Sequence, residues 1–151
     1  MRMSDIIKVS LVNIPPQNKV LVTWELTKNC NYRCSYCNFF AEEKFFSETK
    51  IIDFLKYIQN IKEVDLLLFG GECTTHPNFL NILNQLKELN LYYLSFFTNL
   101  SFDFLTLEKI FNAYPFKSIH VTYHPIKSNL KDFIKKLKYI KELGVKIILT
   151  F

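Results

Sequence analysis

Three cysteines stand close together in the sequence, Cys30, Cys34 and Cys37, with the spacing C-x3-C-x2-C. Thiolates are soft ligands, and three of them at this spacing suit zinc or an iron–sulfur cluster. Structural zinc needs a fourth ligand, whereas a four-iron cluster held by three cysteines keeps one iron open to a substrate or cofactor. The residues that could supply a fourth ligand are Cys73, His76, His120 and His124. The spacing predicts a metal centre and leaves both kinds open.

Three further segments place glycine or polar residues where a predicted strand ends. They contain Gly70, Gly71 and Glu72, then Thr98 and Asn99, then Thr122, Tyr123 and His124. Glycine lets a backbone approach a ligand closely, and a carboxylate accepts hydrogen bonds from an ammonium group. A plain strand-to-helix turn is the alternative explanation for the glycines, and hydrogen bonds to local backbone explain the threonine hydroxyls equally well.

Predicted strands and helices alternate along the chain. Apolar runs predict strands over 19–27, 64–70, 91–99, 117–124 and 145–151. Apolar residues at helical spacing predict helices over 47–61, 77–89, 104–114 and 130–143, with Ser47 as the first cap, Pro77 in a first turn and Gly144 as the last stop. This alternation predicts an α/β fold with a parallel sheet. The cysteine loop and the three polar segments then share the rim at the carboxyl ends of the first four strands.

The fourth predicted strand alternates apolar and polar residues. Ile119 and Val121 should face the helices, so His120, Thr122 and His124 should face the concave side of the sheet. Because His124 is nearest the rim, we expect it to be the catalytic residue that contacts a substrate or cofactor. For His120 a hydrogen-bonded role in the interior is the favoured interpretation.

Length and composition indicate one globular domain. The chain has 151 residues, of which 49% are hydrophobic. Residues 1–19 are expected to form an N-terminal extension with a short strand over 6–17, and residues 20–151 the domain itself. The apolar runs are too short to span a membrane, and the first ten residues lack the apolar segment of a signal peptide, which predicts a cytoplasmic protein. In that compartment closely spaced cysteines favour metal binding or catalysis over disulfides.

The net charge of +5 comes mainly from lysines on predicted helices. In the helix predicted over 130–143 the lysines avoid the apolar positions, and they are Lys131, Lys135, Lys136, Lys138 and Lys141. A solvated helix face explains this pattern better than a nucleic-acid surface does.

Two motifs, in this order, resemble those of one enzyme family. The segment CNYRCSYC resembles the C-x3-C-x-aromatic-C motif of radical S-adenosylmethionine (SAM) enzymes, and FGGECTTHP after the next strand is similar to their glycine-glycine-glutamate motif. The resemblance covers roughly the whole chain and implies a partial barrel of about five strands and four helices, taken from a (β/α)6 core.

The resemblance also implies cofactors and roles. Cys30, Cys34 and Cys37 would ligate a [4Fe–4S] cluster, SAM would chelate the fourth iron, and Tyr36 would lie near the adenine. Gly70, Gly71, Glu72, Thr98, Asn99 and Thr122 would contact SAM. The implied reaction is reductive cleavage of SAM to a 5′-deoxyadenosyl radical, which removes a hydrogen atom from a substrate. A flavodoxin or ferredoxin would supply the electron.

Two features depart from the family pattern. Cys73 stands where relatives often carry proline, a small change within the turn. The sequence also ends inside the fifth predicted strand, whereas the family core usually has six βα units. An apolar edge strand tends to be covered by another chain, so we expect self-association or a partner subunit at 145–151. A cluster-binding subunit that depends on a partner, and a zinc-binding module, remain the alternative functions.

Overall fold

The computed structural model describes residues 18–37, 45 and 47–151. Five strands form one parallel sheet in the order β1-β2-β3-β4-β5. The strands are β1 (Lys19–Thr27), β2 (Glu63–Gly70), β3 (Tyr93–Thr98), β4 (Ser118–Thr122) and β5 (Lys146–Thr150). The helices are α1 (Thr49–Ile58), α2 (Phe79–Lys87), α3 (Phe104–Ala113) and α4 (Leu130–Glu142), with a short 3-10 helix at Cys73–Thr75. The predicted α/β alternation and partial barrel are confirmed.

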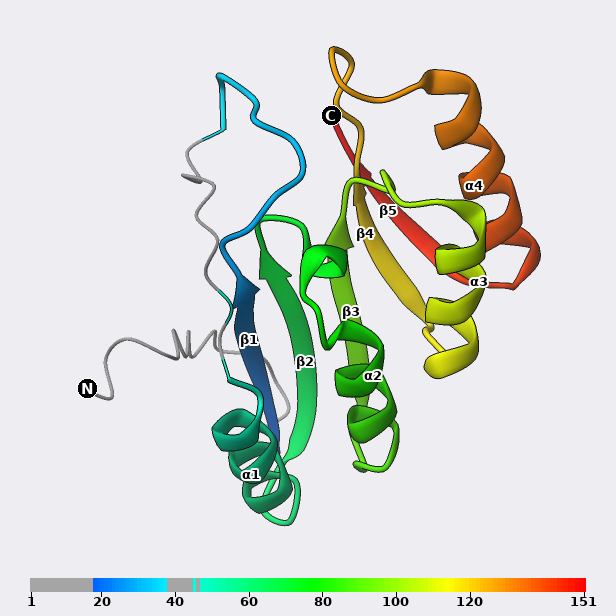
Figure 1. Cartoon of the computed structure of the whole chain (residues 1–151). Helices are drawn as coiled ribbons and strands as arrows, with labels where there is room; N and C mark the ends of the chain where they lie inside the picture. The colour runs from blue at the N-terminus through cyan, green and yellow to red at the C-terminus, as the bar shows by residue number, and fades with distance from the viewer. Residues whose placement is uncertain (1–17, 38–44, 46) are drawn as a thin grey trace.

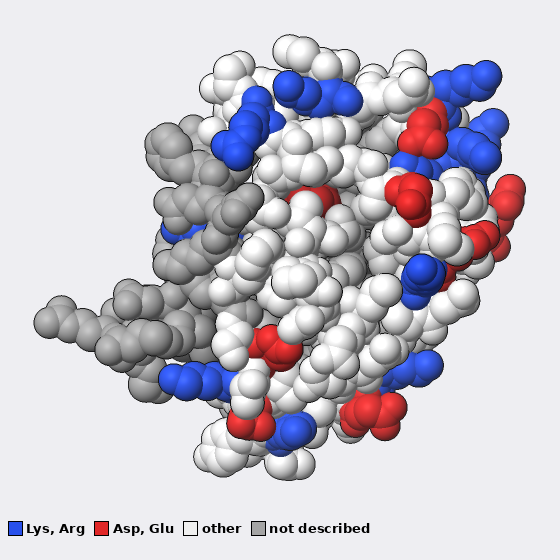
Figure 2. All heavy atoms as spheres, in the orientation of Figure 1, with Lys and Arg blue, Asp and Glu red and all other residues white. Residues whose placement is uncertain are grey.

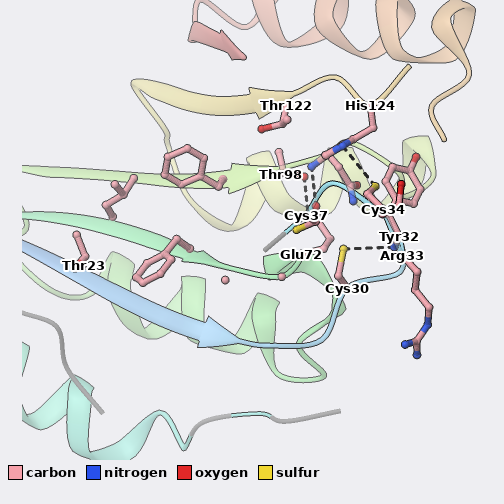
Figure 3. Close-up of a pocket in the computed structure, with 17 residues that line it drawn as sticks. Thr23, Cys30, Tyr32, Arg33, Cys34, Cys37, Glu72, Thr98, Thr122 and His124 are labelled. Carbon is pink, nitrogen blue, oxygen red and sulfur yellow. Dashed lines mark hydrogen bonds between the residues drawn. The ribbon is translucent and has the colours of Figure 1, made fainter. Parts of the chain in front are cut away.

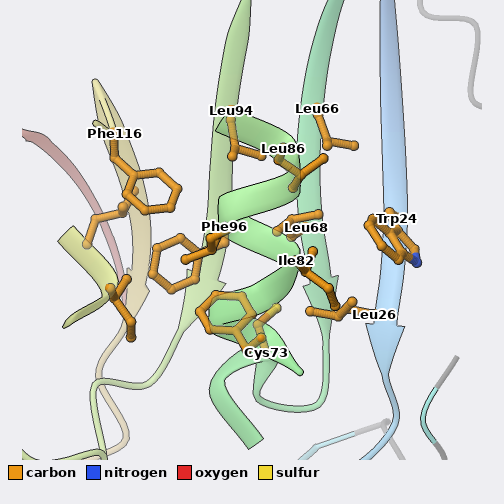
Figure 4. Packing of buried hydrophobic residues seen from close by; sticks show 14 of the residues in the cluster. Trp24, Leu26, Leu66, Leu68, Cys73, Ile82, Leu86, Leu94, Phe96 and Phe116 are labelled. Atoms are coloured by element: carbon orange, nitrogen blue, oxygen red, sulfur yellow. The ribbon is translucent and has the colours of Figure 1, made fainter. Parts of the chain in front are cut away.

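The four helices cover one face of the sheet, and the loops at the carboxyl ends of the strands gather at one rim (Figure 1). The core lies between sheet and helices because alternate strand residues point toward the helices. In Figure 4, Trp24 of β1, Leu68 of β2 and Phe96 of β3 lie along this face, with Ile82 and Leu86 of α2 against them. Burying one side chain of this size contributes about 1.5–3 kcal/mol. This core fixes the rim residues relative to one another.

The helix ends differ in part from the prediction. Helix α1 begins at Thr49 after Glu48, so Ser47 is not its cap, and α2 begins at Phe79, so Pro77 lies before it. Asp103 caps α3 by accepting a hydrogen bond from the Thr106 amide at 2.6 Å. Gly144 ends α4 with a φ of +76°, as predicted. The strand expected over 6–17 lies outside the described residues.

The lysine-rich helix α4 departs from the prediction at one position. Lys136 is 2% exposed, whereas Lys131, Lys135 and Lys138 on the same helix are exposed. The prediction of a solvated lysine face is therefore wrong at Lys136. On the face of the molecule in Figure 2, basic side chains are interspersed with acidic ones toward the periphery. Within the described part of the chain, each helix is too short or too polar to cross a membrane.

Candidate functional site

A cavity of about 770 Å³ opens at the carboxyl ends of β1 to β4. Figure 3 shows side chains from the cysteine loop and from the ends of β2, β3 and β4 gathered around it. Ten predicted site residues line it, namely Cys30, Cys34, Cys37, Gly70, Gly71, Glu72, Thr98, Asn99, Thr122 and His124. The cysteine loop and the three polar segments, which were predicted to share one rim, therefore do so.

The cysteine loop follows β1 and places its three thiols on the cavity wall. All three cysteines are free, and Cys37 is exposed. The Cys37 amide donates to the carbonyl of Cys34 at 3.1 Å, which closes a tight turn, and the Tyr32 amide donates to the Cys30 sulfur at 3.4 Å. Burial raises the pKa of the Cys30 thiol, and the negative charges of Glu72 and the neighbouring thiolates add to this rise. A bound cation would relieve that repulsion.

Gly70, the last residue of β2, and Gly71 are required because they lie against the backbone of Thr27 and Asn29, where β1 leads into the cysteine loop. A Cβ on Gly70 would lie 2.1 Å from the carbonyl oxygen of Thr27, and a Cβ on Gly71 would lie 2.2 Å from that of Asn29. Gly70 also has a φ of +142°, which side-chain-bearing residues rarely adopt. The Gly71 amide donates to Thr27 at 2.8 Å, and the next amide, that of Glu72, donates to Asn29 at 2.8 Å. We expected the glycines to allow close approach to a ligand. In the structure they allow the end of β2 to lie close to the backbone where β1 leads into the cysteine loop.

Glu72 is the central acidic group of the site and is only 1% exposed. Its Oε1 accepts hydrogen bonds from the amide and hydroxyl of Thr74, at 3.2 and 2.7 Å, and from the Thr98 hydroxyl at 3.0 Å. Its Oε2 accepts the Asn99 amide at 2.6 Å. Burial raises the pKa of Glu72, and these hydrogen bonds oppose the rise. A carboxylate oxygen has two lone pairs, so Oε2 retains acceptor capacity for a donor in the cavity.

The loop after β3 connects Glu72 to the cysteine loop. Asn99 is 5% exposed, and its side-chain amide donates to Asn31 Oδ1 at 3.0 Å. The Asn31 side chain donates in turn to the Ser101 hydroxyl at 2.7 Å. Sequence reasoning missed Asn31 and Ser101 as parts of this site. The asparagines that flank Cys30 were the available signal, because asparagine side chains commonly form hydrogen bonds within turns and loops.

His124, just beyond β4, packs against the cysteine loop. Its ring is stacked on Tyr36, with centroids 6.1 Å apart, and meets Tyr32 edge-on at 5.6 Å. Its Nδ1 lies 2.9 Å from the Tyr36 hydroxyl and 3.8 Å from the Cys34 sulfur. Tyr36 is 55% exposed and is not among the residues that line the cavity. The Tyr36 ring, expected near an adenine, contacts His124 here.

The other residues considered as a fourth zinc ligand lie elsewhere. Cys73 is 1% exposed and belongs to the core (Figure 4), and burial raises the pKa of its thiol well above the usual value. His76 meets Phe45 edge-on, and His120 packs on Phe97. His124 alone among these four candidates lines the cavity. Among the described residues, no group of three or more His, Cys, Asp or Glu side chains is arranged to hold a single metal ion.

The chemistry of the cavity fits a [4Fe–4S] cluster together with SAM. Three free thiols line one wall, and each would bind a different iron, so they need not converge on one point. The buried carboxylate of Glu72 lies on the same cavity and can accept from the ammonium group of SAM. Thr122 also lines this cavity.

Comparison with solved structures finds the same fold in known enzymes. BtrN in complex with AdoMet (SAM) and 2-DOIA superposes with a TM-score of 0.64 at 15% identity, over 87% of this chain and 55% of BtrN. SuiB of Streptococcus suis superposes with a TM-score of 0.67 at 20% identity, over 87% of this chain and 32% of SuiB. The chain thus spans about half of BtrN and about a third of SuiB. No curated protein sequence matches the chain significantly.

The sequence itself matches one protein family. The model of the Radical SAM superfamily matches residues 24–151, which include the cysteine loop, the glycine-glycine-glutamate segment and all five strands from Trp24 onward. Enzymes of this superfamily use a [4Fe–4S] cluster and SAM as cofactors. The chain therefore belongs to the radical SAM superfamily of enzymes.

Proposed function

We propose that this chain binds a [4Fe–4S] cluster through Cys30, Cys34 and Cys37 and binds SAM in the adjoining cavity. When bound, cluster and SAM would supply one-electron chemistry: an electron from an external donor would cleave a carbon–sulfur bond of SAM into methionine and a 5′-deoxyadenosyl radical, which would remove a hydrogen atom from a substrate. One observation carries the proposal: the three thiols and the buried Glu72 carboxylate line the same cavity. Thiolates are the soft ligands that a cluster requires, and a carboxylate is a hydrogen-bond acceptor for the ammonium group of SAM.

Each polar group of the cavity named above has a role in this proposal. Glu72 accepts from the SAM ammonium through the free capacity of Oε2. Thr122 offers a hydroxyl from the end of β4. Thr98 and Asn99 contribute mainly by holding Glu72, because the Thr98 hydroxyl and the Asn99 amide already donate to its carboxylate. Gly70 and Gly71 let the cysteine loop lie against the end of β2.

His124 has two compatible roles at the edge of the cavity. Its ring holds Tyr32 and Tyr36, so we assign it first to positioning the cysteine loop. It also lines the cavity, which supports the proposed contact with substrate or SAM. A bound SAM would compete with His124 for the Tyr36 ring if Tyr36 contacts the adenine as the resemblance implies.

Partners of the chain belong to the proposal as well. Reductive cleavage needs an external one-electron donor, for which a flavodoxin or ferredoxin is suited. Pairing of another chain along β5 stays a prediction; Leu149 and Phe151 are 41% and 88% exposed there. SuiB has also been solved bound to its precursor peptide SuiA.

Anaerobic turnover tests the proposed function. The reconstituted chain, reduced with dithionite in the presence of SAM, is expected to release 5′-deoxyadenosine and methionine. A matched sample of Cys34→Ala should release neither, because two thiols cannot hold the cluster. SAM that remains intact with a fully reconstituted and reduced cluster would contradict the proposed cleavage.

A further inference from the structure

Lys136 is a buried cation beside the proposed cofactor site, although it does not line the cavity. Its Nζ donates to the carbonyl oxygen of Leu100 at 2.9 Å and to that of Phe102, and it pairs with Asp132 at 2.6 Å. Burying an ammonium group is costly unless its charge is paired and its protons are bonded. These three contacts match the three donors of a lysine. Two of them hold the main chain of the loop after β3.

That loop contains a conformation that needs support. Leu100 has a φ of +54°, in the left-handed region that a residue with a Cβ rarely adopts. Its amide donates to the Thr98 hydroxyl at 3.1 Å, and the Ser101 amide donates to Asn99 Oδ1 at 2.9 Å. Strained residues persist where surrounding contacts fix them, and such residues cluster at functional sites. Lys136 provides such contacts from α4, through its hydrogen bonds to the carbonyls of Leu100 and Phe102.

The same loop contacts both Glu72, the proposed SAM-binding carboxylate, and the cysteine loop. The Asn99 amide donates to Glu72, the proposed SAM-binding carboxylate, at 2.6 Å. The Asn99 side chain donates to Asn31, which stands between Cys30 and Cys34 in the sequence, at 3.0 Å. Asn31 also donates to Ser101 at 2.7 Å. A shift of this loop would therefore move the carboxylate and the cysteine loop together.

We propose that Lys136 is a positioning residue for the cofactor site. By holding the carbonyls of Leu100 and Phe102, it keeps the loop after β3 in the conformation that aims Glu72 into the cavity and fixes the cysteine loop through Asn31. The proposal rests on the proposed function of the site. It predicts that a change at Lys136 alters SAM binding without direct contact between Lys136 and SAM.

Four forms of the full chain test this, each reconstituted anaerobically: wild type, Lys136→Met, Lys136→Arg and the exposed control Lys138→Met. Thermal unfolding followed by circular dichroism monitors the fold, and iron analysis monitors the cluster. SAM affinity is measured by isothermal titration of the unreduced protein, in which SAM stays intact, and the electron paramagnetic resonance spectrum of the reduced cluster is recorded in samples frozen directly after SAM is added. Lys136→Met should bind SAM about tenfold more weakly at equal iron content, the loss typical of one positioning hydrogen bond. Lys136→Arg should recover most of the affinity, and Lys138→Met should match wild type.

Each outcome decides between the proposals. Equal SAM affinity and an equal spectral change in folded Lys136→Met and wild type would overturn the role of Lys136. If Lys136→Met does not fold, Asn31→Ala takes its place. Asn31 is exposed, and its side chain joins the loop after β3 to the cysteine loop through Asn99 and Ser101. Unchanged SAM affinity in Asn31→Ala would then overturn the proposal. A wild-type chain that assembles the cluster yet binds no SAM would instead refute the proposed function, and the role of Lys136 with it.

Discussion

The main-chain amide of Asn99 donates a 2.6 Å hydrogen bond to Oε2 of the buried Glu72. The two residues are far apart in the sequence, at the ends of the neighbouring strands β3 and β2. This bond fixes where the carboxylate points, and the Asn99 side chain extends the connection to the cysteine loop. The proposed sites for cluster and SAM are thereby parts of one hydrogen-bonded unit.

Glu72→Gln should keep the cluster and weaken SAM binding. The amide can retain the Asn99 contact through its oxygen and donate to a threonine hydroxyl through its nitrogen. It loses the hydrogen bond from the Thr74 amide, the longest of the four at 3.2 Å, so most of the local contacts are kept. It lacks the negative charge that strengthens a hydrogen bond from an ammonium group, which should cost about 1–3 kcal/mol of SAM binding. Isothermal titration of the clustered protein measures this, with exposed Glu88→Gln as the control. Equal affinity in the two variants would remove Glu72 from the SAM site.

Gly71→Ala should destabilise the chain more than Gly144→Ala. The added methyl group at Gly71 would lie 2.2 Å from the Asn29 carbonyl, whereas nothing lies within 4 Å at Gly144. At Gly144 the cost is limited to the left-handed backbone, about 1–2 kcal/mol. Urea unfolding of both variants measures the difference. A smaller loss at Gly71 than at Gly144 would show that the cysteine loop does not need this close approach.

His124→Ala should loosen the cysteine loop in the metal-free chain. The substitution removes the ring contacts with Tyr32 and Tyr36 and the hydrogen bond to the Tyr36 hydroxyl. Arg33 is exposed in this loop and provides a trypsin site. Cleavage after Arg33, followed by mass spectrometry, should become roughly tenfold faster, since local opening governs such cleavage. His120→Ala, whose ring packs on Phe97 instead, is the control and should cleave at the wild-type rate.

Asp103 should make the stability of α3 depend on pH in acid. The hydrogen bond from the Thr106 amide lowers the pKa of Asp103 below its usual 3.8. A lowered pKa in the folded state means that the stabilisation is present above pH 3.8 and is lost as the pH falls through the folded pKa. Asp103→Asn keeps the capping oxygen without the charge. Urea unfolding should show wild type more stable than this variant near neutral pH and the gap closing in acid; a gap that widens in acid would contradict the assignment.

The sequence predicted the sheet and the rim, and ten of its eleven predicted site residues line the cavity, because these features depend on local patterns. Apolar runs define strands, and residues that follow parallel strands must meet at one edge. The reason for Gly70 and Gly71 could not be predicted, since it depends on which backbone lies opposite them. Lys136 was misassigned for a related reason. It stands three residues after the buried Phe133 and four before the buried Ile140, on the buried stripe, but its partners are loop carbonyls that a helical pattern does not reveal.

Iron and sulfide analysis after anaerobic reconstitution decides whether the three cysteines hold a cluster, with wild type, Cys34→Ala and Cys73→Ala measured in parallel. We expect about four irons and four sulfides per chain for wild type and for Cys73→Ala, because the Cys73 side chain lies in the core. Cys34→Ala should hold almost none. Zinc without sulfide in the wild-type chain, or loss of iron in Cys73→Ala at unchanged folding, would contradict a cluster held by Cys30, Cys34 and Cys37.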